Sequence, residues 1–581
     1  MLGIHASAFP RTEADIGFGS PLSSGGDRLL AFAAALGFDT IQLGPAGQVS
    51  PINLSPYDGS VLARNPWSLG LTALASDEYA QLLHPALLES LQRQTPRRTT
   101  RVDAPLAAAA SGELLRGCYQ RFCELRVREP AHPLVVGLAD FRRAHADWLG
   151  LNALYEVLAE RVVDDPTRFE PALRALFEPG AAGLQRRAAM RATLGAAIEL
   201  RELAQYLCHL QHDAFRAHAH AQKLAIWGDM QVGYSHRDRF LHAEAFATRW
   251  LLGAPPSRTN PQGQPWGYPL LDPDQLADPQ SPARRLFALR ARKLLAEYDG
   301  VRIDHPHGLV CPWVYRADDP NPQHAVKHGA RVFESPDRDD PDLQRWAIAQ
   351  LTDLAPDASS HFADDWVRTL APDQLDRYAC HFDVLAALCP GAPASQTFAA
   401  EVLSTCPHPL RAVLARHGLG RFRVTQKANP GDVQDPYRTE HARPEDWLML
   451  GTHDTPPIFP VAGRWLRDGS AHARAAYLAE RLIAEPSERA AASNLFASSE
   501  HQLLRASLAD LFGSGAQHVY IFIGDLFGEH EPYNRAGITH PDNWTARLPE
   551  DFEHVYHARV KEGRALDIVG AAKLALERRL A

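Results

Sequence analysis

Residues 297–305 read Glu-Tyr-Asp-Gly-Val-Arg-Ile-Asp-His, a short apolar pattern that ends on an arginine and an aspartate two positions apart. Side chains alternate between the two faces of a strand, so Arg302 and Asp304 are predicted on one face, with Val301 and Ile303 on the other. A paired guanidinium would keep such an aspartate ionised. By itself the stretch fits either a structural ion pair at a strand end or a barrel strand that delivers a nucleophile.

The stretch is one of eight short apolar segments that could each form a buried strand. Amphipathic helical patterns lie between many of them, including residues 27–36, 283–298, 409–417 and 471–484. Strands that alternate with helices indicate a parallel sheet, and eight such units indicate a closed (β/α)8 barrel, the TIM barrel. The eight predicted strands are residues 3–8, 38–43, 224–229, 300–304, 397–403, 422–426, 447–453 and 519–524.

Carboxylates stand at the ends of four predicted strands: Asp229, Asp304, Glu401 and the pair His453-Asp454. In (β/α)8 barrels the active site lies at the C-terminal ends of the strands. Loops are polar in any protein, and His453-Asp454 could also cap a strand-to-helix turn. Four strand ends that each carry a carboxylate nevertheless favour a functional site.

The chain of 581 residues is interpreted as a single catalytic barrel, residues 1–581, with helical insertions around the C-terminal face of the barrel. Residues 78–221 show helical periodicity over a length too great for one crossover helix, which predicts an inserted helical subdomain. Residues 311–393 form a second long insertion after the strand that carries Asp304. This insertion is expected to shape the mouth of the site.

Composition argues against several kinds of partner. The 60 Lys and Arg residues are dispersed in a chain of net charge -9, so we expect no nucleic acid partner. The chain lacks a secretory signal at its start and an apolar run of about 20 residues, so we expect no membrane partner. The seven cysteines are odd in number and lack C-x-x-C spacing, which indicates reduced thiols in a cytoplasmic protein. We expect either a monomer or a homodimer.

One histidine pair, His324 and His328, has the i, i+4 spacing that could hold a metal from one helix face. The pair lacks the glutamate of an H-E-x-x-H motif, and no third ligand is evident in the sequence. We therefore predict neither a metal nor a cofactor.

Several short motifs occur in a fixed order from the first predicted strand to near the C-terminus. They are Gln42-Leu43-Gly44-Pro45, Ser55-Pro56-Tyr57, Ala63-Arg64-Asn65-Pro66, Gly228-Asp229-Met230, GQPWGYP at residues 263–269, Arg302-Ile303-Asp304-His305, Ala400-Glu401-Val402-Leu403, Gly451-Thr452-His453-Asp454, YNRAG at residues 533–537, and Asn543-Trp544 with Arg547-Leu548-Pro549. Together they resemble the 4-α-glucanotransferases called amylomaltases or disproportionating enzymes, glycoside hydrolase family 77.

The resemblance implies a retaining double displacement at an α-1,4-glucosidic bond, between a malto-oligosaccharide donor and a sugar acceptor. Asp304 would be the nucleophile that forms a covalent glycosyl-enzyme, kept ionised by Arg302. Glu401 would be the general acid and then the base, with a pKa above that of Asp304 and a carboxyl-to-carboxyl distance of about 5 to 5.5 Å. Asp454 would stabilise the transition state, and His453 would donate a hydrogen bond to the same sugar.

Other matched residues are candidates for sugar binding. Tyr57 would stack on the central sugar ring and Trp266 would offer an aromatic platform, although either ring could be an ordinary core or rim residue. Asp229, Asn534 and Arg547 could hydrogen-bond sugars or could brace loops.

The chain departs from the family pattern near these positions. Val402 replaces an aspartate beside the acid, Pro306 and His307 replace a phenylalanine and an arginine after the nucleophile, Pro532 replaces an arginine, and Ser257 replaces an acidic residue. Strand alternation puts Val402 on the face opposite Glu401, so this change could be structural only. The other four residues lie where donor or acceptor sugars would bind. We therefore expect a shorter or different acceptor than a typical amylomaltase uses.

Two other functions stay open. One is an α-glucan hydrolase with water as the acceptor, which the same three carboxylates would serve. The other is a glycan-binding relative that has lost catalysis, and the presence of all three carboxylates argues against it.

Overall fold

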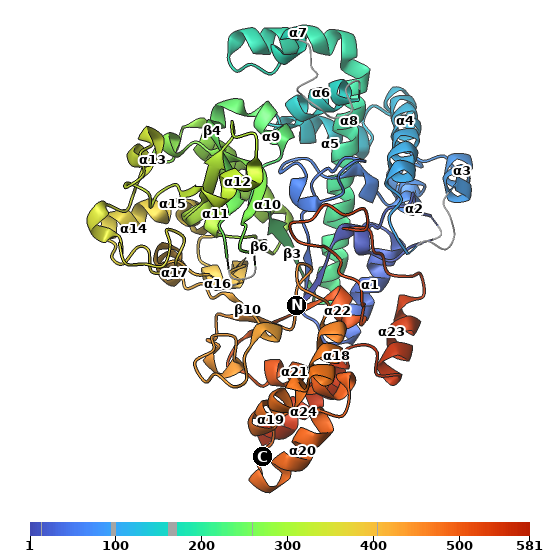
Figure 1. The fold of residues 1–581 in the computed structure, drawn as a ribbon. Coiled ribbons are helices and arrows are strands. Elements are labelled where there is room, and N and C mark those ends of the chain that lie inside the picture. The colour runs from blue at the N-terminus through green and yellow to red at the C-terminus, as the bar shows by residue number, and fades with distance from the viewer. Residues whose placement is uncertain (13, 95–99, 161–170, 258–259, 404, 581) are drawn as a thin grey trace.

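The computed structural model describes residues 1–581 apart from 13, 95–99, 161–170, 258–259, 404 and 581. Among the described residues, eight parallel strands form the barrel at the centre of Figure 1, and each predicted strand overlaps one of them. The barrel prediction is confirmed. The strands are β1 (Leu2–Ile4), β2 (Thr40–Leu43), β3 (Ala225–Met230), β6 (Gly300–Ile303), β9 (Phe398–Ala400), β10 (Phe422–Val424), β11 (Trp447–Met449) and β12 (His518–Phe522).

Each barrel strand pairs with its neighbours in chain order, from β10 through β12 and β1 to β9. Strands β9 and β10 end this order, and no pairing between them occurs in the described part of the chain, so the barrel is nearly closed. Asp229 on β3 lies opposite Arg302 on β6, and Ile303 lies opposite Ala400 on β9. This register brings the polar ends of three successive strands together.

The four helices predicted from amphipathic patterns are present as α1 (Ser24–Ala35), α10 (Pro282–Glu297), α17 (His408–Arg416) and α19 (Ser470–Leu482). Helix α10 leads directly into β6. It starts with a proline in its first turn, and the Ser281 side chain accepts a hydrogen bond from the Arg284 amide as an N-cap. Val301 and Ile303 are fully buried in a core shared with α10, so β6 turns its apolar face outward and Arg302 toward the barrel interior.

An antiparallel sheet beside the barrel was missing from the sequence-based prediction. Among the described residues it has four strands in the order β5-β4-β7-β8, with β4 (Phe246–Ala254), β5 (Gln264–Leu271), β7 (Trp313–Arg316) and β8 (Ala330–Arg331). Two of these strands lie within residues 311–393. The description of the insertions as helical was therefore incomplete.

Residues 78–221 contain mainly helices, seen at the top and right of Figure 1. Their core also includes residues of the N-terminal segment, among them Ile16, Phe18 and Trp67. Whether they form a separate subdomain stays a prediction, and residues 95–99 and 161–170 lie outside the described residues. The helices are α3 (Pro85–Gln94), α4 (Ala104–Arg128), α5 (Pro133–Ala144), α6 (Leu149–Ala159), α7 (Pro171–Arg174) and α8 (Ala181–Ala221).

Most of the remaining helices form two groups. One follows β6 and includes α11 (His307–Val310), α12 (Pro322–Lys327), α13 (Pro341–Trp346), α14 (Pro372–Tyr378), α15 (Cys380–Leu388) and α16 (Ala394–Thr397). The other, at the bottom and right of Figure 1, contains α18 (Ile458–Asp468), α20 (Arg489–Phe496), α21 (Glu500–Phe512), α22 (Ile523–Leu526), α23 (Phe552–Lys561) and α24 (Ile568–Leu580). Helices α2 (Leu71–Leu74) and α9 (His236–Leu241) are short connections. Within the described chain, no helix combines the length and the apolar character needed to cross a membrane.

Candidate active site

Arg302 lies at the centre of the site, buried inside the barrel on β6. Its Nη1 donates to Asp229 Oδ2 at 2.5 Å. Its Nη2 donates to Asp304 Oδ1 at 3.1 Å and also contacts Glu401 Oε1. Three carboxyl groups from three neighbouring strands therefore share one guanidinium. One positive charge cannot compensate three negative charges in a buried site, so protonated carboxyl groups are favoured here.

Asp304 is the first residue after β6 and lines the cleft described below. Its Oδ1 accepts from Arg302, and its Oδ2 accepts from the Val232 amide at 3.1 Å. The predicted pairing of Arg302 with Asp304 is present. Two donors from different parts of the chain thus orient both carboxylate oxygens.

Glu401 follows β9 and is buried, with 4% of its surface exposed. Burial raises the pKa of Glu401 to about 8, and the charges of Asp304 and Asp454 act in the same direction. Arg302 and His453 oppose this rise without cancelling it. The Glu401 carboxyl therefore holds its proton at neutral pH.

Asp229 lies beneath Tyr57 and does not line the cleft. The Tyr57 hydroxyl donates to Asp229 Oδ2 at 3.0 Å, and Gln42 Nε2 donates to the same oxygen at 3.2 Å. The hydroxyl also accepts from Arg302 Nη1 at 3.1 Å. Burial raises the pKa of Asp229 to about 6, although Arg302 opposes the rise. These contacts favour a bracing role for Asp229 over direct contact with a sugar.

Asp454 is held by two neighbours, Asn534 and His453. Asn534 Nδ2 donates to its Oδ1 at 2.6 Å, and His453 Nε2 lies 3.2 Å from its Oδ2. Burial alone would raise the pKa of Asp454, but the charge and hydrogen bond of His453, with the Asn534 amide, lower it. Burial would lower the pKa of His453, but Asp454 raises it. Both shifts favour an imidazolium beside a carboxylate.

Aromatic rings pack around this ion pair. Tyr57 stacks on His453, with ring centroids 5.5 Å apart and an interplanar angle of 19°. His5 meets His453 edge-on at 4.8 Å, stacks on Tyr533 at 5.3 Å and contacts Trp544 at 5.1 Å. His5 and Trp544 were not among the predicted site residues. The position of His5 just after β1 was a signal that could have identified it, because other strand ends carry site residues.

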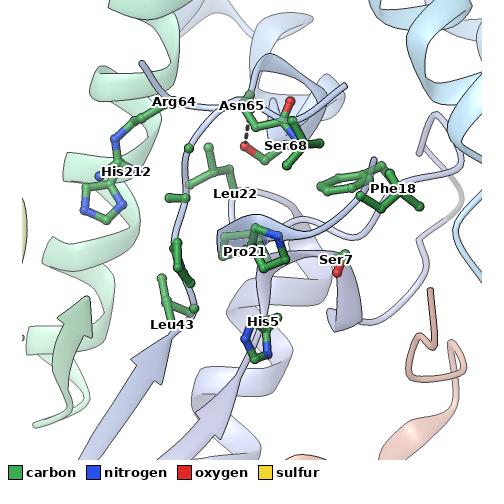
Figure 2. A pocket seen from close by; sticks show the side chains of 18 residues that line it. His5, Ser7, Phe18, Pro21, Leu22, Leu43, Arg64, Asn65, Ser68 and His212 are labelled. Carbon is green, nitrogen blue, oxygen red and sulfur yellow. Dashed lines mark hydrogen bonds between the residues drawn. The ribbon is translucent and has the colours of Figure 1, made fainter. Parts of the chain in front are cut away.

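A small cavity adjoins this cluster (Figure 2). Its volume is about 40 Å³, and its lining includes His5, Ser7, Arg64, Asn65 and His212. A cavity of this size holds at most a few water molecules. It cannot hold a sugar ring.

The main cleft has a volume of about 1480 Å³ and opens over the C-terminal ends of the barrel strands. On its wall, the ring of Trp266 meets His305 edge-on at 4.7 Å. His305 and Trp544 both have left-handed backbone conformations, with φ of 42° and 65°. Such strain in residues other than glycine is concentrated at functional sites. Six of the predicted site residues line the cleft: Asp304, Glu401, Asp454, Tyr57, Trp266 and Asn534.

The remaining candidates lie outside the cleft. Arg302 contacts the lining residue Asp304, and His453 contacts the lining residue Asp454. Arg547 Nη2 pairs with Asp15 Oδ2 at 2.5 Å in a buried position, which ties it to the N-terminal segment. Val402 is buried in the core, as strand alternation predicts, whereas Ser257 lines the cleft.

The raised pKa of Glu401 predicts how stability depends on pH. A carboxyl whose folded pKa lies above its ordinary value, about 4.3, stabilises the fold fully below that value, and the contribution is lost as pH rises through about 8. Glutamine cannot ionise. We therefore expect the free energy of unfolding of Glu401→Gln, relative to the unmodified protein, to increase between about pH 5 and about pH 9. Urea unfolding at both pH values measures this, and a constant difference would contradict it.

The family model and the curated relatives that match this chain have the same description. Residues 4–552 match the model of glycoside hydrolase family 77, described as 4-alpha-glucanotransferase. A 4-alpha-glucanotransferase from Synechocystis sp. is 27% identical over 286 residues, which cover 47% of this chain and 52% of the relative. One from Mycobacterium tuberculosis is 29% identical over 276 residues, covering 46% and 36%. The chain thus spans about half the length, or less, of these curated relatives.

Solved structures show the same fold at low sequence identity. An amylomaltase from Streptococcus agalactiae in complex with acarbose superimposes with a TM-score of 0.72 at 16% identity, covering 97% of this chain and 99% of that chain. An amylomaltase from Corynebacterium glutamicum gives a TM-score of 0.62 at 18% identity, covering 97% and 75%. The likeness extends over nearly all of this chain.

Proposed function

Because the chain belongs to the 4-alpha-glucanotransferase family, glycoside hydrolase family 77, we propose that it transfers glucosyl or maltooligosyl units between malto-oligosaccharides. The mechanism that we propose is retaining and passes through a covalent glycosyl-aspartate. One observation carries this proposal. Asp304, Glu401 and Asp454 line one cleft, and the first two contact the same nitrogen of Arg302.

The shared nitrogen limits the distance between the two reacting carboxyl groups. Since Asp304 and Glu401 both contact Arg302 Nη2, their nearest oxygens lie within about two hydrogen-bond lengths, roughly 6 Å. Retaining glycosidases separate their two carboxyl groups by about 5 to 5.5 Å, and inverting ones by about 6.5 to 9.5 Å. The close approach of Asp304 and Glu401 supports retention.

In the first step, an Asp304 oxygen bonds to the anomeric carbon of the donor. The bond from that carbon to the leaving sugar's oxygen breaks, and its electron pair stays on the oxygen. Glu401 transfers its proton to the same oxygen, so the shortened glucan leaves as a neutral alcohol. The pKa of Glu401, about 8, keeps this proton available at neutral pH.

In the second step, the roles of the two carboxyl groups reverse. Glu401, now ionised, takes a proton from the acceptor hydroxyl, whose oxygen bonds to the anomeric carbon and displaces Asp304. A sugar acceptor gives transfer, and water gives hydrolysis. Positive charge develops on the sugar ring in both transition states. The Asp454 carboxylate, held by Asn534 and His453, is the group that we assign to stabilise it.

Product analysis from maltotriose tests the proposal. We expect glucose together with products longer than maltotriose, because transfer lengthens one chain as it shortens another. Separation of the products by size, with and without added glucose, measures the outcome. Glucose and maltose alone would indicate hydrolysis, and unchanged maltotriose would favour a glycan-binding protein.

The same assay tests the expected change in acceptor. The residues that follow Asp304 form the nucleophile's loop, and those that follow Glu401 form the acid's loop. His305 and His307 from the nucleophile's loop line the cleft, together with Thr405 from the acid's loop. Because a general acid lies beside the leaving sugar, this wall faces the acceptor side. We expect free glucose or maltose to accelerate consumption of a longer donor. A full ladder from maltotriose that short acceptors do not accelerate would contradict this expectation.

A further inference from the structure

His307 connects the loop of the proposed nucleophile to the loop of the proposed acid. It is three residues after Asp304, begins helix α11, and has 9% of its surface exposed. Its Nε2 lies 3.0 Å from the carbonyl oxygen of Thr405, which is four residues after Glu401. A carbonyl oxygen only accepts hydrogen bonds, so Nε2 is the nitrogen that carries the hydrogen. The contact is a defined hydrogen bond between the two loops.

The nucleophile's loop is also fixed from its other side. Gly308 packs so closely on Val232 that an added Cβ would lie 2.4 Å from Val232 Cγ2. The Val232 amide in turn donates to Asp304 Oδ2 at 3.1 Å. The strained residue His305, with a φ of 42°, lies between Asp304 and Gly308 in the sequence. Such strain persists only where surrounding contacts hold the backbone. The anchored ring of His307 supplies one of those contacts.

Three further hydrogen bonds hold the acid's loop, and all lead away from the nucleophile. In one of them, Lys427 Nζ donates to the Leu403 carbonyl oxygen at 3.5 Å. The Tyr437 hydroxyl donates to the Leu403 carbonyl oxygen at 2.7 Å. The Cys406 amide donates to Asp364 Oδ2 at 2.9 Å. The strand pairing already joins the two segments at their base, where the Glu401 amide donates to the Ile303 carbonyl oxygen at 3.0 Å. Beyond that pairing, in the described part of the chain, the hydrogen bond that joins the acid's loop to the residues after Asp304 is that of His307.

We propose that His307 is a positioning residue that sets the distance between Asp304 and Glu401 through its hydrogen bond to the Thr405 carbonyl. The inference rests on the proposed function, because the distance matters only if both carboxyl groups act on one substrate. A shift of about 1 Å in a reacting group can cost on the order of 10²-fold in rate. Proton transfer from Glu401 to the leaving oxygen is the step most sensitive to such a shift.

Two glycosyl donors, maltotriose and α-maltosyl fluoride, distinguish a positioning role of His307 from a structural one. Maltotriose needs a proton from Glu401 to release its leaving sugar, whereas fluoride leaves α-maltosyl fluoride without one. We expect His307→Phe to slow the first turnover of maltotriose on the order of 10²-fold. The first-turnover release of fluoride is expected to change far less. His307→Gln, whose amide can donate to Thr405, should restore most of the maltotriose rate.

His381→Phe is the matched control. His381 is also buried, and its Nδ1 donates to the Leu309 carbonyl oxygen at 3.0 Å, away from Glu401. This variant should lose stability without selective loss of the maltotriose reaction. The alkaline limb of the rate profile, set by Glu401 with Arg302, Asp304, His453 and Asp454, should move in His307→Phe and not in the control.

Equal slowing of both donors by His307→Phe, or failure of His307→Gln to restore the rate, would overturn the proposal. If His307→Phe does not fold, His307→Asn, whose shorter amide does not span the distance to Thr405, takes its place in the same assays. If the unmodified protein neither releases fluoride nor extends maltotriose, the proposed function itself fails.

Discussion

We expect Asp304→Asn to lower turnover of maltotriose on the order of 10⁴-fold or more while the protein stays folded. An amide has no anionic oxygen to bond to the anomeric carbon, so the covalent step is lost. The amide has nearly the same size as the carboxylate. The contacts of Arg302 with Asp229 and Glu401 remain, so Arg302 keeps two of its three carboxyl partners inside the barrel. Turnover and thermal unfolding of the purified variant measure the two parts of this prediction.

A surface substitution and a chemical rescue make this test specific. Asp376→Asn removes an exposed carboxylate that pairs with Arg416 on the protein surface, and it should leave turnover unchanged. Asp304→Gly leaves space at the nucleophile position. We expect azide to attack the maltosyl fluoride donor there and to give a glycosyl azide of inverted configuration. Near-normal activity in Asp304→Asn would refute the assignment of the nucleophile.

The second large effect is expected for Glu401→Gln. Loss of the general acid should slow maltotriose turnover about 10³-fold, because the leaving oxygen must depart without a proton. First-turnover fluoride release from α-maltosyl fluoride should be affected much less. A nucleophile substitution would slow both donors, so the ratio of the two rates distinguishes the two carboxyl groups.

The pH profile adds an independent readout for Glu401. Its pKa is about 8, so the rate of the unmodified protein should fall as pH rises through about 8 and the acid loses its proton. Glu401→Gln has no proton to lose and should lack this alkaline limb. Maltotriose rates between about pH 5 and about pH 9 measure it. An unchanged limb in the variant would assign the titration to another group.

The antiparallel sheet shows why part of the fold was missed. Its strands were not evident because β4 pairs with β7, a partner far along the chain, through contacts such as Trp250 with Arg316. Prolines and a glycine with positive φ, Gly267, interrupt the pattern of β5. Such strands depend on their partners more than on intrinsic preference. The barrel strands, in contrast, are short apolar runs between amphipathic helices, and this pattern is visible locally.

The candidate site shows the same division. Asp304, Glu401 and Asp454 were recognisable as candidates because they follow apolar strands and occur in short motifs. His5 and Trp544 were missed as site residues because their role comes from rings contributed by distant segments. Asp229 illustrates a different limit. Its motif suggested sugar binding or bracing, and only its burial beneath Tyr57 favours bracing.

Local sequence patterns were enough to predict the barrel, its eight strands and the residue types at their ends, because apolar periodicity and strand alternation are properties of neighbouring residues. How those ends interact depends on the tertiary structure. It places three carboxyl groups around the single guanidinium of Arg302 and buries Glu401 enough to hold its proton. It also joins His307 to Thr405. Charge sharing, desolvation and loop contacts arise between residues far apart in the chain, so they exist only once the chain is folded.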